Sequence, residues 1–339
     1  MNPETLKATA QAIMAPGKGI LAADESTGTI AKRLASIEVE STEANRQAYR
    51  NLLFTTDGVE DYISGVILFE ETLFQSADDG TPFAKLLADK GVVPGIKVDK
   101  GAKPLALSSD EKITEGLDGL RDRLADYGKA GARFAKWRAV IDITADQPTD
   151  YCIETNAHAL ARYAALCQEA DIVPIVEPEV LMDGDHDIAT CEAVTSRVLK
   201  KVFEALESQN VLLEGMLLKP NMIIAGKKSA AQADVEEVAE ATLRCLRRYV
   251  PAAVPGIVFL SGGQSDEVAT AHLNAMNQRG EQPWALSFSY GRALQAPALA
   301  AWQGKPNNVE AAQKAYYKRA KNNGAAAAGQ YSADMESAA

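Results

Sequence analysis

Eight short runs of apolar and β-branched residues recur along the chain, and longer segments with helical periodicity separate them. The runs cover residues 19–24, 63–69, 93–99, 133–141, 173–181, 215–223, 256–263 and 284–291. Glycine or proline precedes most of them, as is common at the start of a strand. Strands that alternate with helices form a parallel sheet. The runs are apolar almost throughout, which indicates strands covered on both faces.

Eight strand–helix units over residues 19–291 fit a closed (β/α)8 barrel. A doubly wound open sheet is the alternative, and it is disfavoured because no GxGxxG follows the first strand. We therefore predict one α/β barrel domain over residues 1–321, including an N-terminal helix. A flexible C-terminal tail is expected over residues 322–339, which are small, polar and rich in Gly and Ala.

Three segments between the runs show apolar residues at helical spacing. They cover residues 110–127, 187–206 and 234–249. Ser108 and Glu111 offer a capping box for the first helix, and Asp234 is a suitable N-cap for the third.

The composition limits the compartment and the class of partner. The 339 residues are 47% hydrophobic and 24% charged, with a formal net charge of −11. This acidic balance excludes a general nucleic-acid binder, which needs a basic stripe. No run of about 18 apolar residues could cross a membrane, and no signal peptide is evident. Four scattered cysteines suit buried thiols in a reducing compartment, so we expect a cytoplasmic protein that binds no nucleic acid and no membrane.

Charged side chains interrupt the apolar runs near their C-terminal ends. They are Asp24, Lys97, Lys136, Arg138, Glu177, Glu179 and Lys219. Burying an unpaired charge is costly, so each needs a reason. Taken singly, a buried lysine or glutamate more often belongs to a structural ion pair. The carboxyl ends of barrel strands carry the active site, so we predict that these side chains converge on one mouth.

Side chains two positions apart on a strand share a face. The pairs expected to do so are Lys136 with Arg138, Glu177 with Glu179, and Lys219 with Asn221. Trp137 would then face away from the cavity. If the shared faces point into the barrel, cations and carboxylates meet in a confined space.

This combination suits carbon–carbon bond chemistry at a ketone. A lysine in a semi-apolar site beside other cations has a lowered pKa, and its neutral amine can form a Schiff base. The protonated imine accepts the electrons of the adjacent bond, while Glu177 or Glu179 transfers protons. The chain has three histidines and none stands at ligand spacing from another. With no flavin or pyridoxal signature either, we expect no metal and no cofactor.

Two later loops have the residues of a phosphate site. Residues 261–265 (SGGQS) follow the seventh run, and Arg292 follows the eighth. These loops are the usual phosphate site of such barrels, where Gly262 allows close backbone approach and Arg292 adds charge. An ordinary glycine-rich turn is the alternative. Lys97 with Arg138 could hold another phosphate, so we expect a phosphorylated ketose, with a second phosphate where both sites are used.

The chain resembles class I fructose-1,6-bisphosphate aldolase from about residue 17 to residue 297. The similar strings are GKGILAADESTGTIAKRL, GIKVDKG, FAKWR, PIVEPEVL, EGMLLKPNM, FLSGGQS and SFSYGRALQ. The resemblance implies a TIM barrel, usually a homotetramer, that acts in glycolysis and gluconeogenesis without a metal. The implied reaction is the reversible cleavage of fructose 1,6-bisphosphate into dihydroxyacetone phosphate and glyceraldehyde 3-phosphate.

The resemblance also implies roles for the charged residues. Lys219 would form the Schiff base, and Glu177 would be the general acid and base. Asp24 would assist proton transfer at the hydroxyl beside the bond that breaks. Lys136 and Glu179 would tune the charge around the imine.

The remaining implied contacts are with the two phosphates. The phosphate on the ketone half would be held by Ser261, Gly262 and Arg292. The phosphate on the aldehyde half would be held by Lys97 and Arg138, with help from Ser26. Lys32 and Arg33 match a basic pair near the substrate, and Arg33 is the expected contact.

Two alternatives and one departure accompany this interpretation. A metal-dependent aldolase would need clustered histidines. A non-catalytic barrel, such as a sugar-phosphate sensor or a cytoskeletal scaffold, would be favoured only if the lysine or the acids were missing. Many animal members end in a tyrosine on a mobile tail, whereas this chain ends in MESAA and its last tyrosine is Tyr331. Either the tail has lost that role or Tyr331 replaces it weakly.

Overall fold

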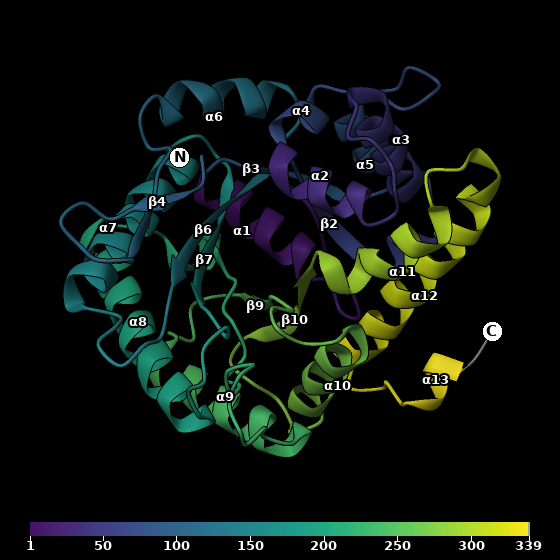
Figure 1. Ribbon diagram of the computed structural model, residues 1–339. Helices are drawn as coiled ribbons and strands as arrows, with labels where there is room; N and C mark the ends of the chain where they lie inside the picture. Colours follow the sequence, from purple (N-terminus) through teal and green to yellow (C-terminus); the bar gives the residue numbers. More distant parts are fainter. Residues whose placement is uncertain (338–339) are drawn as a thin grey trace.

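The computed structural model describes residues 1–337 and contains a closed barrel of eight parallel strands surrounded by helices (Figure 1). The barrel strands are β1 (Gly19–Ala23), β2 (Ile63–Leu68), β3 (Val93–Lys97), β6 (Phe134–Ile141), β7 (Val173–Val180), β8 (Leu217–Leu218), β9 (Gly256–Phe259) and β10 (Ala285–Tyr290). Neighbours in the sequence are neighbours in the barrel, and β10 closes onto β1 with Ser289 beside Ile20. The predicted (β/α)8, or TIM, barrel is confirmed.

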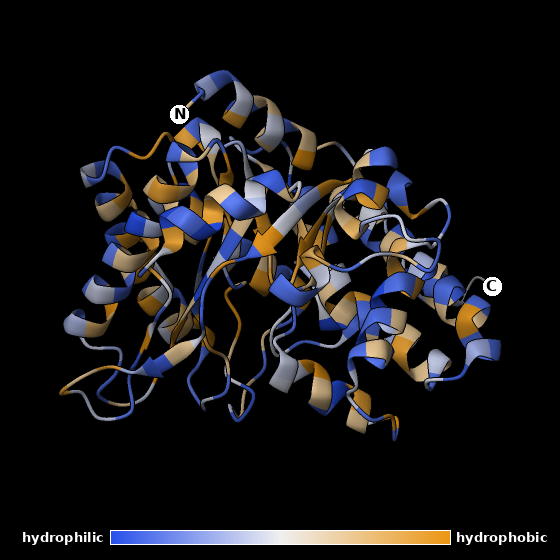
Figure 2. Ribbon diagram, turned by 90° about the horizontal axis from the view of Figure 1, so that it is seen from above, coloured by the Kyte–Doolittle hydropathy of each residue, from blue (hydrophilic) through white to orange (hydrophobic). Residues whose placement is uncertain are grey.

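Helices follow most strands and cover the outside of the barrel. The α-helices are α1 (Pro3–Ile13), α2 (Thr27–Ala35), α3 (Glu43–Phe54), α4 (Glu70–Leu73), α5 (Phe83–Asp89), α6 (Leu120–Lys129), α7 (Asp150–Glu169), α8 (Ile188–Ser208), α9 (Val235–Tyr249), α10 (Asp266–Asn277), α11 (Arg292–Trp302), α12 (Val309–Ala327) and α13 (Asp334–Ser337). Short 3₁₀ turns are η1 (Val59–Asp61), η2 (Leu213–Gly215) and η3 (Pro306–Asn308). Figure 2 shows hydrophobic residues on the central strands, and a mixture of hydrophobic and hydrophilic residues along the surrounding helices. None of the helices within residues 1–337 combines the length and apolarity needed to cross a bilayer.

Capping side chains set the start of several helices, and Asp234 is the cap that the sequence predicts. Asp234 accepts a hydrogen bond from the Glu237 amide at 2.9 Å and begins α9. Asp187 does the same for α8 through the Thr190 amide at 2.8 Å. These bonds satisfy amide groups that have no partner within the helix.

Apolar side chains pack in two layers, one inside the barrel and one between the strands and the helices. The inner layer includes Ile67, Phe134 and Ile175, and it continues onto Leu6 and Ile13 of α1. Helix α1 therefore closes one end of the barrel, and it crosses the barrel in Figure 1.

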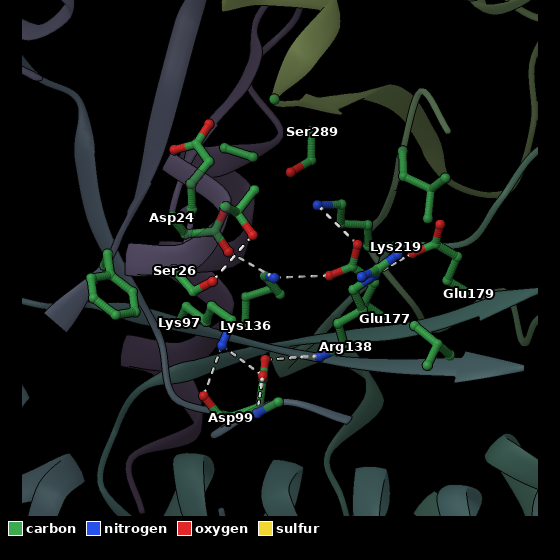
Figure 3. A pocket seen from close by; sticks show the side chains of 18 of the residues that line it. Asp24, Ser26, Lys97, Asp99, Lys136, Arg138, Glu177, Glu179, Lys219 and Ser289 are labelled. Carbon is green, nitrogen blue, oxygen red and sulfur yellow. Dashed lines mark hydrogen bonds and ion pairs between the residues drawn. The ribbon is translucent and has the colours of Figure 1, made fainter. Parts of the chain in front are cut away.

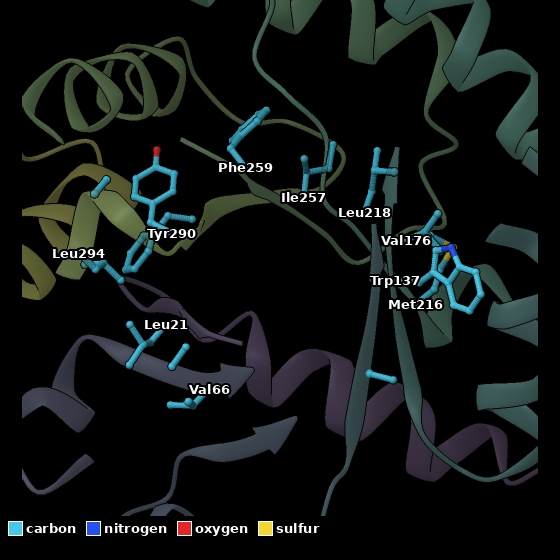
Figure 4. Close-up of a cluster of buried hydrophobic side chains, with 14 of the residues drawn as sticks. Leu21, Val66, Trp137, Val176, Met216, Leu218, Ile257, Phe259, Tyr290 and Leu294 are labelled. Carbon is cyan, nitrogen blue, oxygen red and sulfur yellow. The ribbon is translucent and has the colours of Figure 1, made fainter. Parts of the chain in front are cut away.

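The outer layer joins the strands to the surrounding helices (Figure 4). Trp137 of β6 stacks on Tyr163 of α7, with ring centroids 5.5 Å apart. Trp137 thus faces away from the barrel interior, as the alternation along the strand predicts. The same alternation sends Lys136 and Arg138 to the other face.

The helix predicted over residues 110–127 is correct only in its second half. Residues 102–114 form an antiparallel hairpin of β4 (Ala102–Pro104) and β5 (Lys112–Thr114). Helix α6 begins after Gly119, whose backbone has a left-handed conformation. Ser108 does donate a hydrogen bond to Glu111 at 2.7 Å. However, the buried Glu111 also accepts bonds from the Thr149 amide and hydroxyl at 2.7 Å each, so it braces the start of α7 instead of capping a local helix.

Part of the tail expected over residues 322–339 is helical, and its last two residues lie outside the described residues. Helix α12 continues to Ala327, beyond the boundary expected before residue 322, because its alanines favour helix and Asn323 is buried. Asn323 accepts a hydrogen bond from the Thr270 hydroxyl at 3.0 Å. Farther along, Glu336 pairs with the buried Arg319 at 2.6 Å and accepts a bond from the Tyr331 hydroxyl at 3.0 Å.

Candidate active site

One pocket of about 580 Å³ opens at the carboxyl ends of the barrel strands. Its lining includes all twelve residues predicted for the site: Asp24, Ser26, Arg33, Lys97, Lys136, Arg138, Glu177, Glu179, Lys219, Ser261, Gly262 and Arg292. The predicted convergence of strand-end charges on one mouth is therefore confirmed. Lys32, the neighbour of Arg33, does not line the pocket.

Four buried charges form a continuous chain of ion pairs at the floor of this pocket (Figure 3). Lys219 Nζ lies 3.1 Å from Glu177 Oε1. The other oxygen of Glu177 lies 3.3 Å from Lys136 Nζ, which in turn lies 2.7 Å from Asp24 Oδ2. Glu177 is thus shared by two lysines, and Lys136 is shared by two carboxylates.

These ion pairs set the protonation of Asp24, Lys136 and Glu177. Burial alone would raise the pKa of Asp24 and of Glu177, but the charges of Lys136 and Lys219 outweigh burial and hold both pKa values below their usual range. Burial alone would lower the pKa of Lys136, and its two carboxylate partners raise it instead. At neutral pH, Asp24 and Glu177 are therefore anionic and Lys136 is cationic.

Strand register brings these side chains together. In the barrel, Lys136 lies beside Lys97 of β3, and Arg138 lies beside Glu177 of β7. Lys219 follows the two-residue strand β8, and its amide donates to the carbonyl of Val176 at 2.8 Å, which extends the pairing with β7.

Asn221 does not share a face with Lys219, so that expectation is wrong. Strand β8 ends at Leu218 and Pro220 intervenes, so the alternation does not continue. The Asn221 side chain accepts a hydrogen bond from the Val180 amide at 3.0 Å and donates one to Thr195 of α8 at 3.2 Å. It therefore fastens the end of β7 to α8 behind the pocket.

A second cationic group lies on the β3 and β6 side of the pocket. Lys97 Nζ donates to the Asp99 carboxylate at 2.7 Å and to the Asp99 carbonyl at 2.8 Å. The Arg138 guanidinium pairs with the buried Glu179, and this charge holds the pKa of Arg138 above its usual range even though burial lowers it. The Arg138 side chain remains 43% exposed, so it can still meet a ligand.

The loops after β9 and β10 form the opposite side of the pocket. Gly263 has a φ of +77°, and a Cβ there would lie 2.2 Å from the Met182 side chain, so only glycine fits. Arg292 begins α11 and lies 3.4 Å from Asp266, and it also donates to the carbonyl of Gln264. His272 fixes the Gln264 side chain through a 2.6 Å hydrogen bond.

Several lining residues were not predicted from the sequence, namely Glu25, Thr29, Asp99 and Ser289. The Ser289 side chain is buried, and its hydroxyl has no hydrogen-bond partner within the described residues. It lies at the carboxyl end of β10, and Figure 3 shows it beside Lys219. The position of a serine near the end of the eighth apolar run was the available signal, as it was for Asp99 at the end of the third.

The cysteines and histidines lie apart from this chemistry. All four cysteines are free and buried. His158 is exposed, whereas His186 and His272 are buried. Across residues 1–337, no three His, Cys, Asp or Glu side chains are grouped so that they could share a metal ion.

Comparison with known proteins identifies the family to which this geometry belongs. The family model described as fructose-bisphosphate aldolase class-I matches residues 5–339. The chain belongs to the class I fructose-bisphosphate aldolases. It is accordingly a metal-independent lyase that acts on a sugar phosphate in glycolysis.

Relatives of this aldolase share most of its length. A protein of Xanthomonas campestris pv. campestris named probable fructose-bisphosphate aldolase class 1 is 61% identical over 98% of this chain and 99% of its own. Fructose-bisphosphate aldolase 6, cytosolic, of Arabidopsis thaliana is 59% identical over 98% of this chain and 93% of its own.

A solved structure of an aldolase has nearly the same fold. It is the Plasmodium falciparum fructose-bisphosphate aldolase in complex with TRAP and a small-molecule inhibitor. Its TM-score to this aldolase is 0.96, with 53% identity over 97% of this chain and 95% of that one.

Replacing Lys136 with methionine should change how the stability of this aldolase depends on pH. A carboxyl whose native pKa is depressed contributes stability above its unfolded pKa, and loses that contribution as the pH falls. The wild-type free energy of unfolding should therefore fall from about pH 5 to about pH 2. Without Lys136 the native pKa values of Asp24 and Glu177 rise. The slope of the unfolding free energy against pH should then correspond to about one fewer proton taken up on unfolding.

Urea unfolding at successive pH values measures this slope. The matched control is K129M, because Lys129 forms an exposed pair with Asp126 at 3.2 Å and should leave the slope unchanged. At pH 7 the K136M variant should be less stable by about 3 kcal/mol, since it leaves Asp24 buried without its partner. Equal slopes in K136M and wild type would contradict the assigned ionisation.

Proposed function

We propose that this aldolase cleaves fructose 1,6-bisphosphate reversibly through a Schiff base on Lys219. The observation that carries the proposal is the position of Lys219 Nζ, 3.1 Å from a buried carboxylate that is itself bound to a second lysine. Attack on a ketone requires an amine that gives up a proton, and Glu177 is placed to take it. The products are dihydroxyacetone phosphate and glyceraldehyde 3-phosphate, and the reverse reaction serves gluconeogenesis.

Imine formation is the first half of the proposed mechanism. The neutral amine of Lys219 adds to the C2 carbonyl and gives a carbinolamine. Glu177 then delivers a proton to the C2 hydroxyl, which leaves as water, and the protonated imine forms. Lys136 stays charged throughout because Asp24 and Glu177 raise its pKa, so it keeps Glu177 oriented toward the reacting nitrogen.

Bond cleavage is the second half. Asp24 takes part in removing the proton of the C4 hydroxyl, the C3–C4 bond breaks, and its electron pair passes to the imine to form an enamine. Glyceraldehyde 3-phosphate leaves as the aldehyde. Protonation of C3 and hydrolysis of the imine then release dihydroxyacetone phosphate and restore Lys219. Glu179 tunes the charge around the imine through its pair with Arg138.

Two phosphate subsites on opposite sides of the pocket support a bisphosphate substrate. The ketone-half phosphate would bind Ser261, Gly262 and Arg292, where two loops and the start of α11 meet. The aldehyde-half phosphate would bind Lys97 and Arg138, with help from Ser26, and Arg33 would be a further contact with the substrate. Arginine and backbone amides are common phosphate donors in such barrels.

The same proposal extends to assembly, location and the tail. We propose a cytoplasmic homotetramer, as the family resemblance implies. A cytosolic name among the relatives, four free cysteines and the exposed side chains of Phe74, Leu107 and Tyr151 support it. Tyr331 does not line the pocket and its hydroxyl donates to Glu336, so these contacts give Tyr331 no part in the proposed mechanism.

Borohydride added during turnover should reduce the imine and leave a covalent ketose-derived adduct on Lys219. Peptide mass spectrometry locates it. The K219A variant should fold, form no adduct and lose at least about 10³-fold in kcat. The control K228A changes an exposed lysine and should retain both adduct and activity. A wild-type protein without an adduct, and inactivated by a chelator, would contradict the proposal.

The R138M variant tests the aldehyde-half subsite. Its kcat/KM for fructose 1,6-bisphosphate should fall by about 10- to 100-fold because a charge-assisted phosphate contact is lost. Fructose 1-phosphate has no phosphate on that half, so its kcat/KM should fall by a smaller factor, which measures only the loss of the Arg138–Glu179 pair. Equal losses for the two substrates would refute the assignment of Arg138.

A further inference from the structure

A second cluster of charges lies beside the pocket and joins β1 to α3 and α11. At its centre is Glu25, whose side chain is only 4% exposed. One carboxylate oxygen contacts Arg33 Nη1 and accepts a hydrogen bond from the Gln295 amide at 2.8 Å. The other oxygen lies 2.8 Å from Arg50 Nη2. One carboxylate is therefore shared by two guanidinium groups.

Gln295 and Tyr49 hold this carboxylate from behind. The Gln295 amide also donates to the carbonyl of Ala22 at 2.7 Å, which ties α11 to the last residues of β1. Its side-chain oxygen accepts a hydrogen bond from the Tyr49 hydroxyl at 3.1 Å. Gln295 and Tyr49 are both buried, so Glu25 has a fixed place in the cluster.

The two arginines differ in what they can reach. Arg33 lines the pocket, and its side chain is 25% exposed. Arg50 is 3% exposed, does not line the pocket, and leaves its Nε and Nη1 atoms without hydrogen-bond partners within residues 1–337. A guanidinium buried in this way contributes little to the stability of the fold, because its desolvation is costly and its hydrogen bonds are incomplete. Its close partner is Glu25.

The charge balance of the cluster explains this arrangement. A lone Glu25–Arg33 pair would be neutral, and a substrate phosphate would have to compete with Glu25 for the donors of Arg33. With Arg50 also present, the charge of Glu25 is already compensated, and one positive charge remains for an anion at the pocket wall. That charge is presented by Arg33, whose planar group suits phosphate.

We propose that Arg50 is a positioning residue for the substrate phosphate: it compensates Glu25 and so keeps Arg33 available to bind. The inference rests on the proposed contact between Arg33 and the substrate. Arg50 itself touches no substrate, and its effect passes through Glu25 to Arg33. The effect should therefore appear in substrate binding and not in the chemical steps at Lys219.

Steady-state kinetics of the full chain with fructose 1,6-bisphosphate test this. The R50M variant should raise KM about tenfold, with kcat within about twofold of wild type. The conservative R50K variant restores the charge and should return KM to within about threefold of wild type. If R50M does not fold, R50Q carries the test, because it keeps a polar side chain and removes the charge.

Arg46 provides the matched control on the same helix. It pairs with Glu71 at 2.6 Å, is largely buried and does not line the pocket. The R46M variant removes a comparable ion pair from α3 and should leave KM unchanged. An equal rise of KM in R46M and R50M would mean that loosening α3 is sufficient, and would overturn the proposal.

A double-mutant cycle with R33M separates this inference from the proposed function. R33M alone should raise KM. In the R33M background, R50M should change KM by less than about twofold, since the side chain through which Arg50 acts is absent. Additive effects, or an R50M KM equal to wild type, would overturn the role of Arg50 alone. An unchanged KM in R33M would instead refute the proposed contact between Arg33 and the substrate.

Discussion

The arrangement of the site depends on the carboxylate of Glu177 between two buried lysines. Removing four charged groups from water is costly, and the cost is offset only when each charge has a close partner. Here Lys136 and Lys219 share Glu177, and Lys136 also holds Asp24. Loss of any one of these four charges would therefore leave a buried partner uncompensated and destabilise the fold. In the proposed mechanism, these ion pairs also hold Glu177 beside the amine of Lys219 before a substrate arrives, which lowers the reorganisation needed during reaction.

The barrel provides the rigid frame for these ion pairs. Strand register sets Arg138 beside Glu177, and the pairing of Lys219 with Val176 extends β8 by one hydrogen bond. The outward face of β6 packs through Trp137 on α7, so the inward side chains keep their direction. Helix α1 closes one end, and the site occupies the carboxyl ends of the strands. Stability and chemistry thus use different parts of the same strands.

Sequence reasoning succeeded where a strand period controls direction and failed where distant segments meet. Lys136, Arg138 and Glu177 could be placed because alternation and the barrel topology determine their faces. Asn221 could not, because β8 ends before it. The spacing of apolar residues also suggested a helix where Glu111 instead braces α7. The cluster around Glu25 could not be predicted from the neighbouring sequence, because Gln295 lies 270 positions away in the chain.

The fate of the C2 oxygen tests the central claim most directly. A route through an imine on Lys219 expels this oxygen as water, and hydrolysis replaces it with an oxygen from the solvent. Cleavage in ¹⁸O-enriched water, with the product reduced as it forms, should give dihydroxyacetone phosphate that carries solvent oxygen at C2 on every turnover. Dihydroxyacetone phosphate incubated alone gives the background exchange. Product that retains its original oxygen would contradict the Schiff-base account.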